Sequence, residues 1–116
     1  MAIYNQLMVY KTVQQLLVEV VRASHSANRE FRYTLFQDLK NALTQLLVQI
    51  YRINRTHDKT QPLMLSREMA VEASIYLHLL GELKGVLVKQ YAMLLDLLDS
   101  SSKQLAAWEK AIAPTS

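Results

Sequence analysis

Residues 34–57, TLFQDLKNALTQLLVQIYRINRTH, carry the clearest structural pattern in the chain. Their apolar residues recur at steps of three and four positions, which is the spacing of one face of an α-helix and not the alternation of a strand. The stretch therefore predicts an amphipathic helix, with Thr34 as its N-cap. The predicted buried face is made of Leu35, Leu39, Leu43, Leu46, Ile50 and Ile53.

The same spacing predicts three further helices, at about residues 3–25, 65–86 and 89–112, the last of them ended by Pro114. Four helices of this length, joined by short connections, favour an up-down-up-down four-helix bundle in which sequential helices are antiparallel neighbours. The stripe predicted for the first of these helices is Leu7, Tyr10, Val13, Leu17 and Val20, and Leu16 and Val21 widen it.

Polar or helix-breaking residues mark the predicted turns. Residues 24–32 (SHSANREFR) form the first turn, and residues 57–64 (HDKTQPLM) form the second, where Pro62 is expected to stop helix continuation. Ser66 is a plausible N-cap for the helix that follows. Gly85 is the candidate C-terminal signal of that helix, although periodicity alone allows the helix to continue.

Composition supports an all-α fold of one domain spanning residues 1–116. Hydrophobic residues make up 51% of the 116-residue, 13.3 kDa chain and charged residues 20%, which excludes a disordered protein. There are only two Gly and two Pro, too few for an all-β fold with many tight turns. The absence of Cys excludes disulfides, Cys-ligated metals and a thiol nucleophile.

Neither a membrane span nor a secretory signal is visible. The uncharged run between Lys40 and Arg52 has eleven residues, residues 41–51, against the roughly 20 that a spanning helix needs. The first residues, MAIYNQLMVYK, lack a basic segment followed by an apolar one. We therefore expect a cytoplasmic protein with no membrane partner.

Every predicted helix carries apolar residues beyond a single stripe. In a monomeric bundle each helix has one face in water, so the surplus indicates a subunit interface and a homo-oligomer. The alternative is that wide stripes pack deeper into one core. The candidate interface residues are Val9, Val18, Leu47, Tyr51, Ile75 and Leu77.

Catalytic patterns are scarce. His25, His57 and His78 lie on three segments, and no His-Glu-x-x-His or Glu-x-x-His spacing occurs. His78 and Glu82 are four residues apart, but one such pair does not make a metal site. We expect no enzyme activity, no metal, no cofactor and no small-molecule substrate.

Charge is the more informative feature. Residues 1–59 hold eight basic and four acidic side chains, a net of +4, whereas residues 60–116 hold five basic and six acidic ones, a net of −1. Cations near helix C-termini also favour the helix dipole, which is the purely structural explanation. The sequence pI of about 9.3 is compatible with nucleic-acid binding, and Tyr33 and Tyr51 can stack on bases if they are exposed. The candidate binding residues are Arg22, Arg29, Arg32, Lys40, Arg52, Arg55, Lys59 and Arg67.

Several segments, spread over nearly the whole chain, resemble the four-helix-bundle family that contains the accessory variability determinant (Avd) proteins of diversity-generating retroelements and the 23S rRNA intervening-sequence proteins. The basic-aromatic lead into the second helix and the late Leu-x-x-Trp favour the Avd branch. The matching segments are Tyr4-x-x-Leu7 with Val9-Tyr10-Lys11, residues 29–35 (REFRYTL), Ile50-Tyr51-Arg52, Leu83-Lys84, Lys89-Gln90-Tyr91 and Leu105-x-x-Trp108-x-Lys110.

The resemblance implies a homopentameric barrel of such bundles. Its basic surface would bind RNA or DNA without sequence preference, and it would associate with the reverse transcriptase of the element. The protein would then support mutagenic cDNA synthesis and retrohoming without chemistry of its own. Two alternatives remain at this point: an oligomeric adaptor that binds a protein partner and no nucleic acid, and a bundle of the rRNA intervening-sequence type.

Overall fold

The computed structural model describes residues 2–53 and 55–112, with side chains from residue 5 onward; Pro114, the predicted helix stop, and the side chain of Tyr4 lie outside this part. Four long helices and one short one account for the order α1–α5. They are α1 (Ala2–His25), α2 (Arg29–Arg32), α3 (Leu35–Ile53), α4 (Thr60–Glu82) and α5 (Val88–Ile112).

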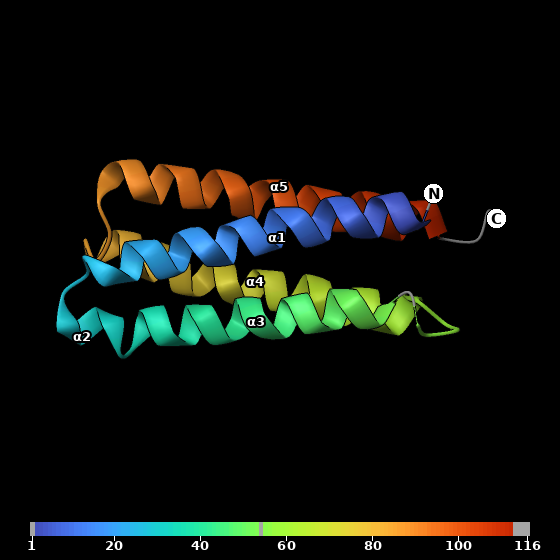
Figure 1. Cartoon of the computed structure of the whole chain (residues 1–116), viewed down its shortest axis with the longest axis horizontal. Helices are drawn as coiled ribbons and strands as arrows, with labels where there is room; N and C mark the ends of the chain where they lie inside the picture. The colour runs from blue at the N-terminus through green and yellow to red at the C-terminus, as the bar shows by residue number, and fades with distance from the viewer. Residues whose placement is uncertain (1, 54, 113–116) are drawn as a thin grey trace.

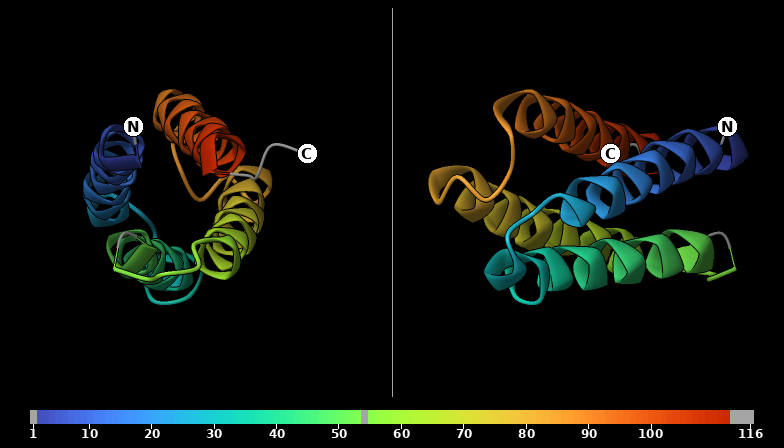
Figure 2. Two further views of the ribbon diagram at one scale, coloured as in Figure 1. Left: turned by 90° about the vertical axis from the view of Figure 1, so that its right-hand side faces the viewer. Right: turned by 60° about the vertical axis from the view of Figure 1, so that its left-hand side comes forward.

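The long helices form the predicted up-down-up-down four-helix bundle (Figure 1). Viewed along its length, each helix occupies one corner of a square, with α1 and α4 each packed against α3 and α5 (Figure 2). The bundle measures 49 × 21 × 20 Å. Within the described residues, no helix combines the length and apolar character needed to cross a membrane.

The core confirms the predicted face of α3 and corrects that of α1. Leu39, Leu43, Leu46, Ile50 and Ile53 of α3 are almost completely buried, and Leu35 is half-buried. In α1 the predicted residues Val13, Leu16 and Val20 are buried, but Val9 and Ala23 complete the buried line, and Leu7 is 52% exposed. Helical spacing allowed both lines on α1; the positions of α3 and α5 beside it decided which one is buried.

The connection between α3 and α4 differs from the predicted loop at both ends. The α3 helix ends at Ile53, and α4 begins at Thr60, so Pro62 lies inside its first turn. Proline is tolerated there because the first N–H groups of a helix have no partner within the helix. Ser66 is therefore no N-cap: it is buried, and its hydroxyl donates to the Pro62 carbonyl at 2.9 Å.

The predicted turn at residues 24–32 contains the short helix α2, whose N-cap is Asn28. Thr34 follows it, but its hydroxyl donates to the carbonyl of Glu30 in the preceding turn. This hydrogen bond occupies Thr34 as a donor at the end of α2, where the sequence predicted an N-cap acceptor for α3.

The connection from α4 to α5 is a helix-ending turn whose left-handed residue is Lys84 and not Gly85. Lys84 has a φ of 58°, its N–H donates to the Gly81 carbonyl at 3.1 Å, and the Gly85 N–H donates to the Leu80 carbonyl at 2.8 Å. This pair of bonds is the Schellman pattern. Gly85 is used for space: a Cβ there would lie 3.1 Å from both Leu80 Cδ2 and Phe31 Cγ.

Candidate nucleic-acid interface

The candidate cations gather at opposite ends of the bundle, because α1 and α3 run in opposite directions (Figure 1). One group, which we call the α1–α3 end, surrounds the connection through α2. The other, the α3–α4 end, surrounds residues 52–67. The first group is Arg22, Arg29, Arg32 and Lys40, and the second is Arg52, Arg55, Lys59 and Arg67.

Arg32 is committed to the fold. Its Nε donates to the Ser24 carbonyl at 3.1 Å, and its Nη2 donates to the carbonyls of His25 at 2.8 Å and Ala27 at 3.2 Å. These carbonyls belong to the C-terminal end of α1 and the turn after it, where helices leave acceptors without internal partners. Half-buried Arg32 therefore caps α1, and most of its donors are unavailable to phosphate.

Lys59 has the same role at the C-terminus of α3. Its Nζ donates to the Ile53 carbonyl at 3.3 Å and to the Thr56 carbonyl at 3.2 Å. A positive charge at this position also stabilises the negative end of the helix dipole. For Arg32 and Lys59 the structural explanation of the cation is therefore the one that the contacts support.

Two further cations are paired with carboxylates. Arg22 Nη1 lies 2.8 Å from Glu19 Oε1 on the same helix, and Arg67 Nη1 lies 2.6 Å from Glu109 Oε1 on α5. Both arginines are solvent-exposed and their carboxylate partners are half-buried, so water and salt screen the pairs and they contribute little to stability. The carboxylates of Glu19 and Glu109 nevertheless neutralise the charges of Arg22 and Arg67, which weakens the attraction of these arginines for a polyanion.

The remaining candidates are accessible. Arg29, Arg52 and Arg55 are exposed and Lys40 is half-buried, and none of them makes an ion pair within residues 2–53 and 55–112. Arg55 instead interacts with Tyr51: its guanidinium carbon lies 5.6 Å from the ring centroid, and its Nη1 donates to the Tyr51 hydroxyl at 3.2 Å. We call Tyr51, Arg52 and Arg55 the α3 tip.

Both candidate stacking residues, Tyr33 and Tyr51, are exposed. Tyr51 is 56% exposed and Tyr33 is 65% exposed, so neither is a core residue. Each stands near an exposed arginine, Arg52 or Arg55 for Tyr51 and Arg29 for Tyr33. Proteins that bind single-stranded nucleic acids combine exposed aromatic rings, on which bases stack, with arginines that contact the backbone.

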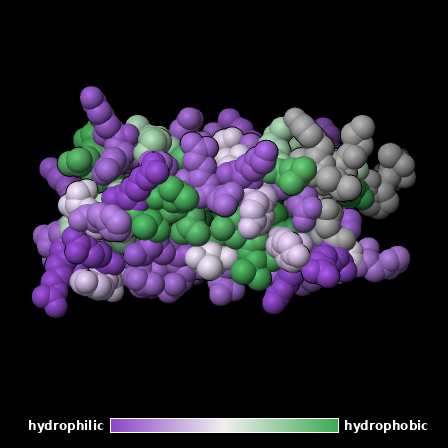
Figure 3. All heavy atoms as spheres, in the orientation of Figure 1, coloured by the Kyte–Doolittle hydropathy of each residue, from purple (hydrophilic) through white to green (hydrophobic). Residues whose placement is uncertain are grey.

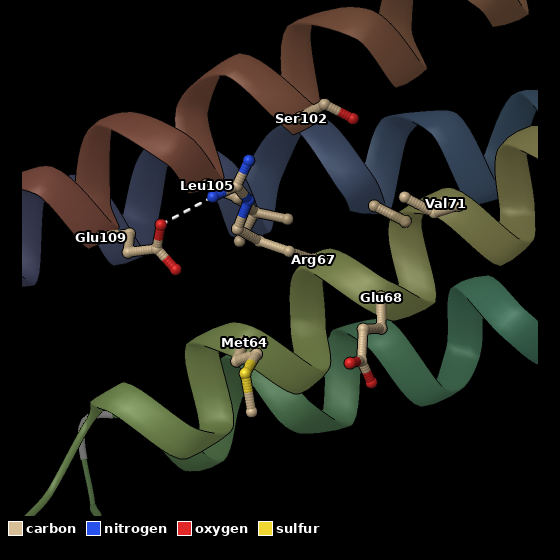
Figure 4. A pocket seen from close by; sticks show the side chains of 8 residues that line it. Met64, Arg67, Glu68, Val71, Ser102, Leu105 and Glu109 are labelled. Atoms are coloured by element: carbon tan, nitrogen blue, oxygen red, sulfur yellow. Dashed lines mark hydrogen bonds and ion pairs between the residues drawn. The ribbon is translucent and has the colours of Figure 1, made fainter.

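A groove between α4 and α5 has a volume of about 320 Å³ (Figure 4). Met64, Val71 and Leu105 supply apolar lining, and the Arg67–Glu109 pair spans the groove from one helix to the other. An apolar groove crossed by a neutralised ion pair offers little to a phosphate.

His78 pairs with Ser74 and not with Glu82. The Ser74 hydroxyl and His78 Nδ1 are 3.2 Å apart, and Asp99 of α5 lines the same shallow groove. Among the described residues, no three His, Asp or Glu side chains come close enough together to hold a metal ion.

The predicted interface residues divide into three groups. Val18, Tyr51 and Ile75 are exposed by 43%, 56% and 54%. Leu47 is half-buried. Val9 and Leu77 are wrong as interface residues, because both lie in the core of the bundle itself, at 0% and 1% exposure.

Sequence reasoning missed the longest exposed apolar line, which lies on α4. Met64, Val71 and Leu79 join Ile75 there, with exposures of 44%, 60% and 43%. Their spacing of seven, four and four residues was a usable signal, since it repeats along one side of a helix. The face formed by α1 and α3 is more mixed, with apolar side chains showing through a largely polar surface (Figure 3).

Comparison with known proteins adds no relative: no protein-family model matches the chain, and no curated protein is significantly similar to it.

Proposed function

We propose that this protein is a non-catalytic accessory subunit of a diversity-generating retroelement, which binds nucleic acid and the reverse transcriptase during mutagenic cDNA synthesis and retrohoming. The observation that carries the proposal is the α3 tip, where an exposed tyrosine lies beside two arginines that no carboxylate neutralises within the described residues. The resemblance to Avd-like proteins supplies the biological setting.

The α3 tip is suited to binding without sequence readout. Arg52 and Arg55 are each able to hold a phosphate through paired N–H donors, and Tyr51 presents a ring on which any base stacks. Phosphate contacts provide affinity and position but no discrimination between bases. Arg29 and Tyr33 form a smaller surface of the same kind at the other end of the bundle.

Self-assembly multiplies this surface. One chain carries a net charge of only +3, but a homopentamer presents five copies of each α3 tip. Several linked contacts raise the overall affinity far above that of one, provided that a strand reaches more than one of them. We expect the assembly to act in the cytoplasm and to use the same arginines on acidic surfaces of the reverse transcriptase.

The test is binding of a labelled single-stranded RNA at a series of salt concentrations. Log affinity should fall linearly with log salt, with a slope of about −0.7 per phosphate contacted. The variant Arg52→Glu/Arg55→Glu should bind at least about tenfold more weakly, and its slope should be less steep by about 1.4, because two phosphate contacts are lost. Its control, Lys89→Glu/Lys103→Glu, makes the same change in net charge on α5 and should lose much less.

A flat salt response would contradict nucleic-acid binding and favour the adaptor, for which the exposed apolar line of α4 is the supporting observation. Light scattering at low and high salt tests the assembly independently. A mass near five times 13.3 kDa at both salts supports the pentamer, and a monomer contradicts it. Co-purification with the reverse transcriptase, compared between the wild type and Arg52→Glu/Arg55→Glu, tests the third part of the proposal.

A further inference from the structure

Two helices, α1 and α4, lie at opposite corners of the bundle (Figure 2). Both turn large apolar side chains toward solvent. On α1 these are Leu7 and Val18, exposed by 52% and 43%. We define the α1 outer face as Leu7, Lys11, Val18 and Arg22, and the α4 outer face as Met64, Glu68, Val71, Ile75 and Leu79. All nine side chains are exposed.

Four of the five residues of the α4 outer face have a counterpart in the α1 outer face, and the fifth, Val71, corresponds to exposed Gln14. Leu7 corresponds to Met64, Lys11 to Glu68, and Val18 to Ile75, each pair being separated by 57 positions in the sequence. Because the spacings are identical, corresponding residues have the same angular position around their helices. The same shift pairs Arg22 with Leu79, where the aliphatic stem of an arginine is able to cover an apolar neighbour.

Corresponding residues also lie at the same height in the bundle. Gln6 Nε2 of α1 donates to the Ile50 carbonyl of α3 at 3.3 Å. Ala42 of α3 shares a groove with Glu72 of α4, and counting eight residues along each of these antiparallel helices places Ile50 level with Met64. Met64 is therefore level with Gln6, one residue from Leu7.

The charges on the two faces are complementary. Lys11 stands where the other face has Glu68, and neither makes an ion pair within residues 2–53 and 55–112. Opposite charges at matched positions favour one register and disfavour shifted ones.

We propose that copies of this chain associate head-to-tail, with the α1 outer face of one copy packed along the α4 outer face of the next. The helices are parallel, Val18 packs against Ile75, and Lys11 pairs with Glu68. Two different faces form such an interface, and it closes into a ring only when successive copies are related by rotation without a shift along the helices. Equal heights meet the part of that condition that concerns the shift along the helices. This proposal deepens the self-association part of the proposed function and rests on it.

A mixing experiment separates this arrangement from an α4–α4 contact between two copies. Val18→Asp disables the α1 outer face and Ile75→Asp the α4 outer face; both sites are exposed, and circular dichroism checks that each variant remains helical. Each variant alone should be monomeric by light scattering, whereas a 1:1 mixture should form a heterodimer through the two intact faces. A mixture that stays monomeric overturns the proposal, and so does Val18→Asp assembling like the wild type.

Charge exchange tests the register. Lys11→Glu and Glu68→Lys should each weaken association about tenfold, and the double variant Lys11→Glu/Glu68→Lys should restore it. No recovery in the double variant overturns the predicted register. Measuring RNA binding by monomeric Ile75→Asp separates this proposal from the proposed function. If RNA binds but the wild-type protein does not assemble, self-association is refuted and the nucleic-acid function stands. If the wild-type protein assembles but no RNA binds, the nucleic-acid function is refuted and self-association stands.

Discussion

The neighbouring helices α3 and α4 contain similar proportions of apolar residues but distribute them differently. On α3 the apolar residues concentrate on one side, and Leu43, Leu46 and Ile50 are completely buried. On α4 one side is buried, represented by Leu77, while the opposite side exposes Val71 and Ile75 by more than half. When the apolar residues of a helix lie on one side, the sequence predicts which side is buried. When they lie on two sides, only the positions of the neighbouring helices determine which side is buried.

The largest test of this comparison is truncation of one residue on each helix. Leu43→Ala should lower the free energy of unfolding by about 2–5 kcal/mol, because it removes buried contacts and leaves a cavity. Val71→Ala, on the outer side of α4, should change it by no more than about 0.5 kcal/mol. Urea unfolding at a concentration where the protein is monomeric measures both. Equal losses would mean that the outer side of α4 is not a free surface.

The second test concerns the end of α4, where Gly81 faces the ring of Tyr91. A Cβ at position 81 would lie 2.3 Å from Tyr91 Cζ, so the ring must move. Gly81→Ala should therefore cost about 1–3 kcal/mol, although alanine favours a helix over glycine. In a Tyr91→Ala background the same change should be neutral or stabilising. A gain in stability with Tyr91 present would contradict the close approach.

The third test compares the C-terminal ends of α3 and α4, which are completed in different ways. Lys59→Met removes the side-chain cap of α3 and should cost about 1 kcal/mol. Lys84→Gly relieves a left-handed backbone at the end of α4 and should gain about 1 kcal/mol. Thermal unfolding of both variants should show shifts of opposite sign. Lys59→Arg, which keeps a donor and the charge, is the control.

The smallest change in stability is expected at Tyr76, whose side chain lies between α3 and α4. Its hydroxyl donates to Glu72 Oε1 at 3.0 Å, and this bond, followed by burial and the charges of Glu72 and Asp38, raises the pKa of Tyr76 above 10.0. The folded state then holds the phenolic proton longer than the unfolded state, so this contribution to stability is present below pH 10 and is lost as pH rises through the folded pKa.

Glu72→Gln should bring the pKa of Tyr76 back toward 10.0 and flatten the loss of stability above that pH. Alkaline titration of phenolate absorbance, with Tyr76→Phe to identify the signal, checks the first part. Urea unfolding on both sides of pH 10 checks the second. An unchanged titration in Glu72→Gln would show that the carboxylate does not hold the proton.

The sequence could predict where the candidate binding residues lie along the chain, but not which of them are accessible to a ligand. Charge counting located the excess of basic side chains in residues 1–59 and named the candidate cations. It could not tell that Arg32 and Lys59 reach back to carbonyls at helix ends, because those contacts depend on the path of a turn. For the same reason, the sequence could not distinguish the accessible cations Arg29, Arg52 and Arg55 from the cations that cap helix ends.

The sequence by itself determined four helices, their order and the buried face of α3, because helical periodicity and the scarcity of Gly and Pro act locally. Only the tertiary structure decided the remaining assignments. It buried Val9 and exposed Leu7, put Pro62 inside a helix, and left one apolar side of α4 in solvent. Periodicity describes the sides of a helix but not its neighbours, and a residue is buried only where another element covers it.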